Sequence, residues 1–253
     1  MPKKKMDIIY EDKELLVINK PPKLLTIATE KEKEHTLYYE ASMYVKKQNP
    51  KNKIFIVHRL DRDTSGIVVF AKNELLKKSL QSNWENLAQK REYLAIVEGK
   101  FKRKKDTLIN YLKESKTLQV YDTKNPQKGK KAITNYEVLE EANTYTLIKV
   151  NIETGRKNQI RVAFANIGHP ILGDKKYQSN KNPYGRLALH ASTLKLKHPR
   201  NKKTLQFFSK APREWKRDFK TGIEEYEKEI NLLWYWNRWW NKRGITWKDY
   251  KRK

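Results

Sequence analysis

One short segment of the chain is dense in side chains that could do nucleophilic or acid–base chemistry. It reads His58-Arg59-Leu60-Asp61-Arg62-Asp63-Thr64-Ser65-Gly66. If the backbone from Arg59 to Asp61 is extended, the two side chains share one face. A guanidinium beside Asp61 would keep its carboxylate ionised, as a nucleophile or general base requires. A surface turn with ordinary ion pairs has the same composition, so the segment alone fits both interpretations.

Two further segments carry polar groups where the pattern predicts ordered structure. Residues 154–162, TGRKNQIRV, place Gln159 and Arg161 among apolar residues at the start of an expected short helix. Arginines at a helix N-terminus favour an anion site. Residues 91–95, REYLA, place Tyr93 in an expected strand, where packing in the core is its usual role.

The elements that must position these residues follow from hydrophobic period and turn signals. Strands predominate, with a few helices between them, so we predict the α+β class with a mixed, largely antiparallel sheet. Strands are expected at 8–20 (two strands and a turn), 54–57, 67–72, 91–99, 133–152 (a hairpin turning at 141–144) and 187–210 (a second hairpin). Helices are expected at 35–48, at 74–89 with Asn73 as its cap, and between 154 and Gly168.

Composition excludes several classes of protein. The 253 residues include 56 Lys or Arg and 29 Asp or Glu, a net charge of +27, which favours a polyanionic partner such as nucleic acid. A lysine-rich solvated surface without a ligand is the alternative. There is no cysteine and no apolar run of membrane length, so we expect no disulfide, no metal site, no membrane span and a cytoplasmic location.

The last forty residues differ in character from the rest. Six of the seven Trp fall between Trp215 and the C-terminus, interleaved with Lys and Arg. We predict a first domain over 1–213 and a basic, Trp-rich helical extension over 214–253. This extension either packs on the first domain or contacts RNA through its basic face; binding of a membrane surface is a third possibility.

The three chemistry-bearing segments, taken in this order, resemble the pseudouridine synthases of the RluA family. The strongest likeness is HRLDRDTSGIVVFAK, and REYLAIVEG, TGRKNQIRV and LALHASTLKLKHP extend it over residues 7–212. His58 and Ser65 favour this family over its sister family for the small ribosomal subunit.

The resemblance implies an isomerase that detaches uracil from C1′ of a uridine and rejoins it through C5, without cofactor or metal. It implies that Asp61 is the essential aspartate, as nucleophile or base. Tyr93 would pack on the uracil ring and assist proton removal from C5, and Arg161 would pair with Asp61. The partner would be structured RNA, ribosomal or transfer, and we expect a monomer.

The resemblance also implies how RNA is held. Arg59 would hold the target nucleotide out of its stack, because a stacked base hides its glycosidic bond, and Ile160 would line the pocket. The remaining residues expected to contact RNA come from the same two segments: Arg62, Thr64, Arg156 and Gln159.

Three departures from the family pattern concern RNA positioning. Asn158 and Ala163 stand where the family usually has His, and LLTIATE replaces the usual His-Pro after the opening turn. Only six residues precede Asp7, so we expect no N-terminal S4-type domain. A catalytically idle RNA-binding or ribosome-assembly factor on the same fold is the alternative function.

Overall fold

The computed structural model describes residues 6–30, 32–123 and 125–243 and, within these ranges, side chains up to residue 232. The helices are α1 (Leu37–Gln48), α2 (Glu74–Ser82), α3 (Trp84–Leu87), α4 (Gln159–Asn166) and α5 (Lys220–Arg243). The strands are β1 (Ile8–Glu11), β2 (Leu15–Lys20), β3 (Phe55–Ile56), β4 (Ser65–Ala71), β5 (Ala88–Glu98), β6 (Lys105–Glu114), β7 (Val120–Asp122), β8 (Lys130–Glu141), β9 (Tyr145–Ile152), β10 (Leu189–Lys197) and β11 (Thr204–Phe208).

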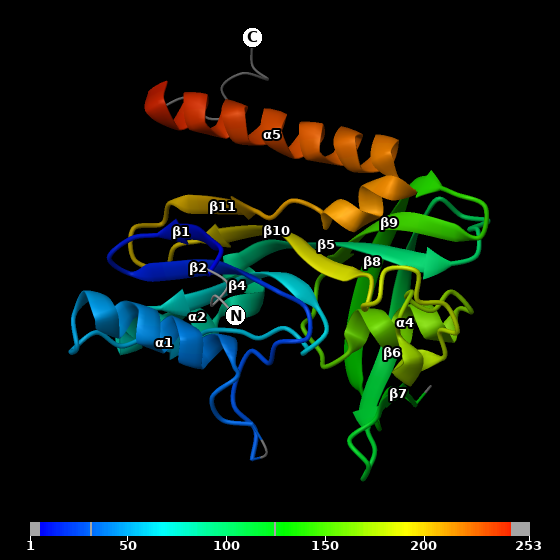
Figure 1. Ribbon diagram of the computed structural model, residues 1–253, viewed down its shortest axis with the longest axis horizontal. Coiled ribbons are helices and arrows are strands. Elements are labelled where there is room, and N and C mark those ends of the chain that lie inside the picture. The colour runs from blue at the N-terminus through cyan, green and yellow to red at the C-terminus, as the bar shows by residue number, and fades with distance from the viewer. Residues whose placement is uncertain (1–5, 31, 124, 244–253) are drawn as a thin grey trace.

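These strands join in one mixed sheet of order β1-β2-β4-β10-β5-β9-β8-β6-β7, with β11 on β10 and β3 on β4 (Figure 1). The pairings are antiparallel except for β4 with β10, where His190 pairs with Ser65 and Ala191 with Gly66. The fold is therefore α+β, and the predicted class is confirmed.

The parallel contact between β4 and β10 requires a glycine. Gly66 has φ +113°, and a Cβ at this position would lie 2.2 Å from the Ala191 carbonyl oxygen. Only a residue without Cβ allows the two backbones to approach this closely. This approach brings the end of the Asp61 segment against β10 in the middle of the sheet.

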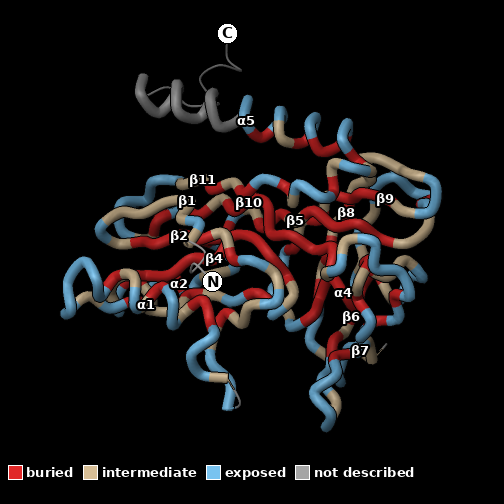
Figure 2. Tube along the Cα trace, in the orientation of Figure 1, coloured by how far each residue is buried: buried red, intermediate tan, exposed pale blue. Residues whose placement is uncertain are grey.

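Side-chain alternation along β2 shows how the sheet separates two cores. Leu15 and Val17 pack with α2 and its neighbours, whereas Leu16 and Ile18 pack with α1 on the opposite face. Figure 2 shows this buried interior continuing through β4, β10 and β5. The sheet is thus covered on both faces where it carries the Asp61 segment.

The first part of α5 and the short helical turn before it, Arg213–Arg217, belong to the main core. Trp215, Phe219, Ile223, Tyr226 and Ile230 recur at helical spacing, are at most 2% exposed and share a core cluster with β5, β9 and α4. Residues 215–230 therefore share the core of the sheet and form no separate one. The domain boundary predicted between residues 213 and 214 remains a prediction. The tryptophans that follow residue 232 lie outside the described side chains.

Most expected elements are confirmed, and one is wrong in its extent. Asn73 caps α2 by accepting from the Leu76 amide at 2.7 Å, and residues 133–152 form the β8–β9 hairpin. The helix expected over 74–89 instead breaks at Asn83, and β5 already begins at Ala88. Ala88 packs against the sheet core, so tertiary burial overrides its local helix propensity.

The contact of α5 with β5 rests on a buried hydrogen bond that can be tested. The Tyr226 hydroxyl donates to Glu92 Oε1 at 2.7 Å, and Glu92 is only 3% exposed. We expect Tyr226→Phe to lower the free energy of unfolding by about 2 kcal/mol, because a buried carboxylate loses a donor. Urea denaturation measures this, with the exposed Tyr39→Phe as control. A change equal to that of the control would contradict the anchoring role.

Candidate active site

Asp61 lies in the loop between β3 and β4, and two buried side chains fix this loop. Thr26 Oγ1 donates to the Leu60 carbonyl at 2.8 Å and accepts from the Leu60 amide at 3.2 Å. Lys20 Nζ donates to the Arg62 carbonyl at 2.9 Å. The backbone is therefore held on both sides of Asp61, whose own side chain is 31% exposed.

Arg161, in the first turn of α4, faces two carboxylates. Its Nε and Nη2 each donate to Asp174 at 2.7 Å, and its Nη1 lies 3.5 Å from Asp61 Oδ2. Burial alone would lower the pKa of Arg161, but the hydrogen bonds and charge of Asp174, together with Asp61, raise this pKa above its usual value. The guanidinium thus stays charged and presents one nitrogen to Asp61.

Tyr177 supports Arg161 from the side. The Arg161 guanidinium lies 5.0 Å from the centre of the Tyr177 ring, a distance typical of a cation–π contact. The Tyr177 hydroxyl donates to the Val120 carbonyl at 3.1 Å and accepts from Asn158 Nδ2 at 3.0 Å. Asn158, one of the departures from the family pattern, therefore takes part in holding Arg161.

Tyr93 comes to the same region from β5. It packs against both main core clusters. Burial raises the pKa of its hydroxyl to about 12; the Arg91 charge opposes this rise and the Asp61 charge adds to it. One of these clusters contains Leu60, the residue before Asp61, so Tyr93 approaches the region in which Asp61 faces Arg161. A carboxylate, a phenol and a fixed cation together can carry out acid–base or nucleophilic chemistry.

The other residues expected at the site differ in their exposure to solvent. Arg59 and Arg62 are exposed beside Asp61 and are free to meet a ligand. Arg156 is partly exposed, with its Nη1 3.8 Å from Glu85. Thr64, Gln159 and Ile160 are at most 5% exposed.

Gln159 has a structural explanation for its position. Its Oε1 accepts from Thr154 Oγ1 at 2.8 Å and from the Arg156 amide at 3.0 Å. Its Nε2 donates to the Ile133 carbonyl at 2.9 Å and to Thr134 Oγ1 at 3.0 Å. The side chain therefore ties the 154–158 turn to β8, which fixes where α4 and Arg161 begin.

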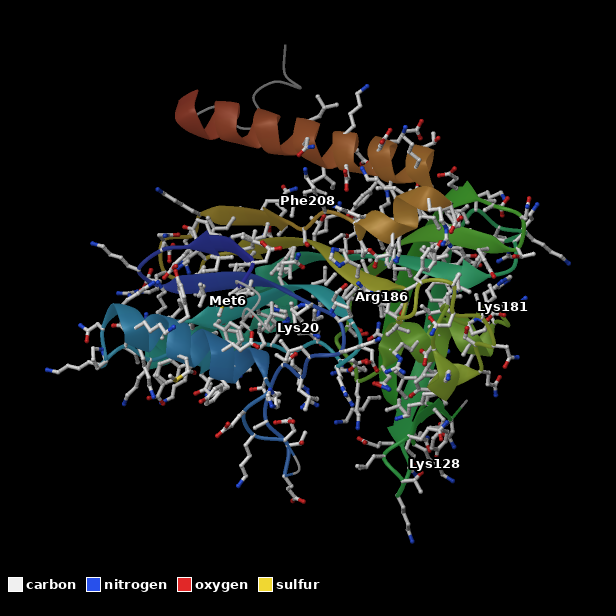
Figure 3. The ribbon with its side chains drawn as sticks, in the orientation of Figure 1. Met6, Lys20, Lys128, Lys181, Arg186 and Phe208 are labelled. Carbon is white, nitrogen blue, oxygen red and sulfur yellow. The ribbon has the colours of Figure 1, made fainter. Side chains whose placement is uncertain are left out.

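Sequence reasoning missed two residues that shape the site, Lys20 and Asp174. The position of Lys20 could have been found from the sequence, because it follows Leu16 and Ile18 on the face of β2 that packs on α1. Asp174 had no local signal, because its pairing with Arg161 depends on how the chain folds back after α4. Figure 3 labels Lys20 near the centre of the molecule.

Arg186, also labelled in Figure 3, belongs to a second network behind the Asp61 loop. It donates from Nη2 to Ser65 Oγ, whose own proton must then go to His190 Nδ1 at 2.8 Å. Burial lowers the pKa of His190 to about 4, as does the Arg186 charge, so this imidazole is neutral and can accept. The network joins the start of β4 to β10.

The described ranges contain neither a metal-binding cluster nor a membrane-spanning helix. Among the described side chains, no three His, Asp or Glu are grouped so that they could hold a metal ion. No helix in these ranges is both long and apolar enough to span a bilayer.

Comparison with known proteins gives consistent matches. The family described as RNA pseudouridylate synthase matches residues 14–166. "Uncharacterized RNA pseudouridine synthase YhcT" of Bacillus subtilis is 35% identical over 77% of this chain and 65% of its own length. "Ribosomal large subunit pseudouridine synthase D" of Haemophilus influenzae is 31% identical over 82% of this chain and 68% of its own length. The chain thus spans about two thirds of these relatives.

A solved structure shares the fold. "Human RNA Pseudouridylate Synthase Domain Containing 4" superposes with a TM-score of 0.70 at 22% identity, over 86% of this chain and 93% of that one. The sheet described above is therefore the architecture of this structural neighbour.

The Lys20 ammonium gives a testable pH dependence. It donates to the carbonyls of Pro21, Leu24 and Arg62 at 2.7–3.0 Å, and burial lowers its pKa from 10.5 to about 7 despite the opposing charges of Asp63 and Asp61. Between these pH values the unfolded chain binds more protons than the folded chain, so this group makes stability rise with pH.

We therefore expect the difference in unfolding free energy, wild type minus Lys20→Met, to grow by about 1 kcal/mol per pH unit from pH 7 to 9. Urea denaturation at several pH values measures it. The same comparison with the exposed Lys13→Met should give a constant difference. A constant difference for Lys20→Met would overturn the assignment.

Proposed function

Because this chain belongs to the RNA pseudouridylate synthase family, we propose that it isomerises specific uridines to pseudouridine in structured RNA. The observation that carries this proposal is the convergence of Asp61, Tyr93 and Arg161. All three lie inside the matched range 14–166. Arg161 of α4 lies 3.5 Å from Asp61 in the β3–β4 loop, and Tyr93 of β5 packs on the core cluster that contains Leu60.

The geometry supports a distinct role for each group. Asp61 is partly exposed and lies 3.5 Å from a cation that is itself bound by Asp174, so its carboxylate can reach a substrate. It acts on the ribose or the base as nucleophile or base while the bond from C1′ to uracil breaks. Tyr93 packs on the released ring, which rotates and rejoins through C5, and Tyr93 assists loss of the C5 proton.

Arg59 and Arg62 supply the access that the chemistry needs. Both flank Asp61 and are exposed. A uridine must leave its stack before a carboxylate can reach its glycosidic bond. The two guanidiniums are placed to hold the phosphates of such an extruded nucleotide, with Arg59 as the residue that keeps it out of the stack.

A wider RNA surface lies on the segments that project beyond the sheet. Figure 1 shows the β6–β7 hairpin and the loop before α1 extending from the same side of the molecule. The hairpin and the start of β8 expose Tyr121 and Leu118 together with basic side chains, namely Lys113, Lys116, Lys128, Lys130 and Lys131. Lysines neutralise phosphates and aromatic rings stack on unpaired bases.

We take ribosomal RNA as the first target to test, and transfer RNA as the second. The match to "Ribosomal large subunit pseudouridine synthase D" supports this order. A ribosomal substrate would place the protein in the cytoplasm.

The chemistry is tested with RNA labelled with tritium at C5 of uridine. We expect the wild type to release tritium, and Asp61→Asn to lower the rate on the order of 10³-fold or more, because the reacting carboxylate is lost. The variant should keep its melting temperature, since Arg161 remains bound to Asp174. Absence of release by the wild type, or equal release by both, contradicts the proposal.

The same variant separates the enzyme from the idle RNA-binding factor. If Asp61→Asn restores growth of a deletion strain while releasing no tritium, the protein acts by binding RNA. Mapping pseudouridine in the deletion strain against its parent identifies the target uridine.

The lysines around β8 are tested by salt dependence. We expect the triple variant Lys128→Gln, Lys130→Gln, Lys131→Gln to raise KM for RNA and to reduce the slope of log Kd against log salt by about 2, with kcat unchanged. A matched triple on the β10–β11 turn, Lys197→Gln, Lys202→Gln and Lys203→Gln, removes the same charge away from the projecting hairpin. Equal effects of both triples would assign RNA binding to net charge alone.

A further inference from the structure

Arg91 is a buried cation without a close carboxylate. It is 7% exposed on β5, and its Nη2 donates to the Glu153 carbonyl. Its Nε and Nη1 have no hydrogen-bond partner among the residues that the structure describes. Buried charges are normally paired, since an uncompensated one is strongly destabilising, so this arrangement calls for an explanation.

The groups around Arg91 do not neutralise it. His58 faces it from the loop before β4; burial, with the Arg91 charge, lowers the pKa of His58 to about 4, so its imidazole is uncharged. Glu85 of α3 attracts Arg91, but its carboxylate also lies 3.8 Å from Arg156. The charge of Arg156 repels Arg91. The carboxylate whose charge acts on Arg91 is therefore shared with another cation.

The 153–156 turn is shaped around the Arg91 side chain. A Cβ on Gly155 would lie 3.2 Å from Arg91 Nη1, closer than ordinary contact allows. Together with the bond to the Glu153 carbonyl, this turn fixes the guanidinium in one place. The position of the charge is thus built into the fold.

Strand geometry directs this charge toward Tyr93. Residues two apart on a strand share a face, and Arg91 and Tyr93 both belong to the part of β5 that pairs with β10. Glu92, between Arg91 and Tyr93, points to the opposite face, where it meets Tyr226. Of the charges that act on the Tyr93 hydroxyl, Arg91 favours its anionic form and Asp61 opposes it.

We propose that Arg91 is a positioning residue that acts through Tyr93, by stabilising the negative charge that develops on the Tyr93 oxygen during isomerisation. This rests on the proposed function. The cation has no close anion at rest because its counter-charge appears only in the reaction, and a charge fixed beforehand stabilises a transition state without reorganising.

The step balances in protons and electrons. The Tyr93 hydroxyl proton leaves to solvent, and the phenolate oxygen then takes the proton from C5 of the rejoined base. The electron pair of the broken C5–H bond restores the double bond from C5 to C6. The pair of the N1–C6 double bond, formed when the base rejoined, returns to N1, and N1 takes a proton from solvent. The phenol is thereby regenerated, and label from C5 exchanges into water.

The test compares charge-keeping and charge-removing variants, Arg91→Lys against Arg91→Gln and Arg91→Met. Single-turnover tritium release is measured from pH 6 to 9.5, together with KM and the melting temperature. We expect the neutral variants to react about tenfold more slowly with KM unchanged, and to reach a given wild-type rate only about one pH unit higher. Arg91→Lys should keep most of the rate.

A control and three outcomes decide the result. Arg200→Met removes one exposed positive charge elsewhere and should leave the rate and its pH profile unchanged. Equal losses in Arg91→Lys and Arg91→Gln, an effect confined to KM, or failure of both neutral variants to fold would each make Arg91 structural and overturn the proposal. An inactive wild type would instead refute the proposed function.

Discussion

The unequal sharing of the Arg161 guanidinium between two carboxylates is the interaction on which the site depends. Asp174, 2% exposed, takes two hydrogen bonds of 2.7 Å, whereas Asp61 meets one nitrogen at 3.5 Å. Short charge-assisted bonds on both sides would hold Asp61 as firmly as Asp174. Because the two short hydrogen bonds to Asp174 fix the guanidinium, Asp61 lies near a fixed cation while its own carboxylate stays partly exposed.

Around this pair, three buried cations are accommodated in three ways. Arg161 is paired with a carboxylate, Lys20 with three backbone carbonyls, and Arg91 with one carbonyl. The strength of pairing falls in the same order, since carbonyl dipoles compensate a charge less than an anion does. Burial lowers the pKa of Lys20 and Arg91, whereas Asp174 reverses this effect at Arg161. Among the described side chains, only Arg161 of the three has a carboxylate at hydrogen-bond distance, whereas Lys20 and Arg91 depend on backbone carbonyls.

Features set by residues that are close in the sequence could be predicted, whereas contacts between distant segments could not. The Asn73 cap and the β8–β9 hairpin follow from local rules of capping and alternation, and both predictions are confirmed. Strand β6 was not predicted because burial along it does not follow hydrophobicity: Ile109 is exposed, whereas Asn110 is buried. The bond between Asp174 and Arg161 joins a turn to a helix through tertiary folding, so no local pattern indicates it.

The departure at Asn158 shows why the site can tolerate a change in the middle of its motif. Asn158 has φ 55°, in the left-handed region that Asn and His both enter more readily than most residues. The backbone turn that starts α4 therefore accepts either residue. The Asn158 side chain donates one hydrogen bond, of 3.0 Å, to the Tyr177 hydroxyl. This hydroxyl is also held by the Val120 carbonyl, to which it donates. Since Asp174 fixes Arg161 directly and Tyr177 only supports it, a different residue at 158 changes a support and leaves Arg161 beside Asp61.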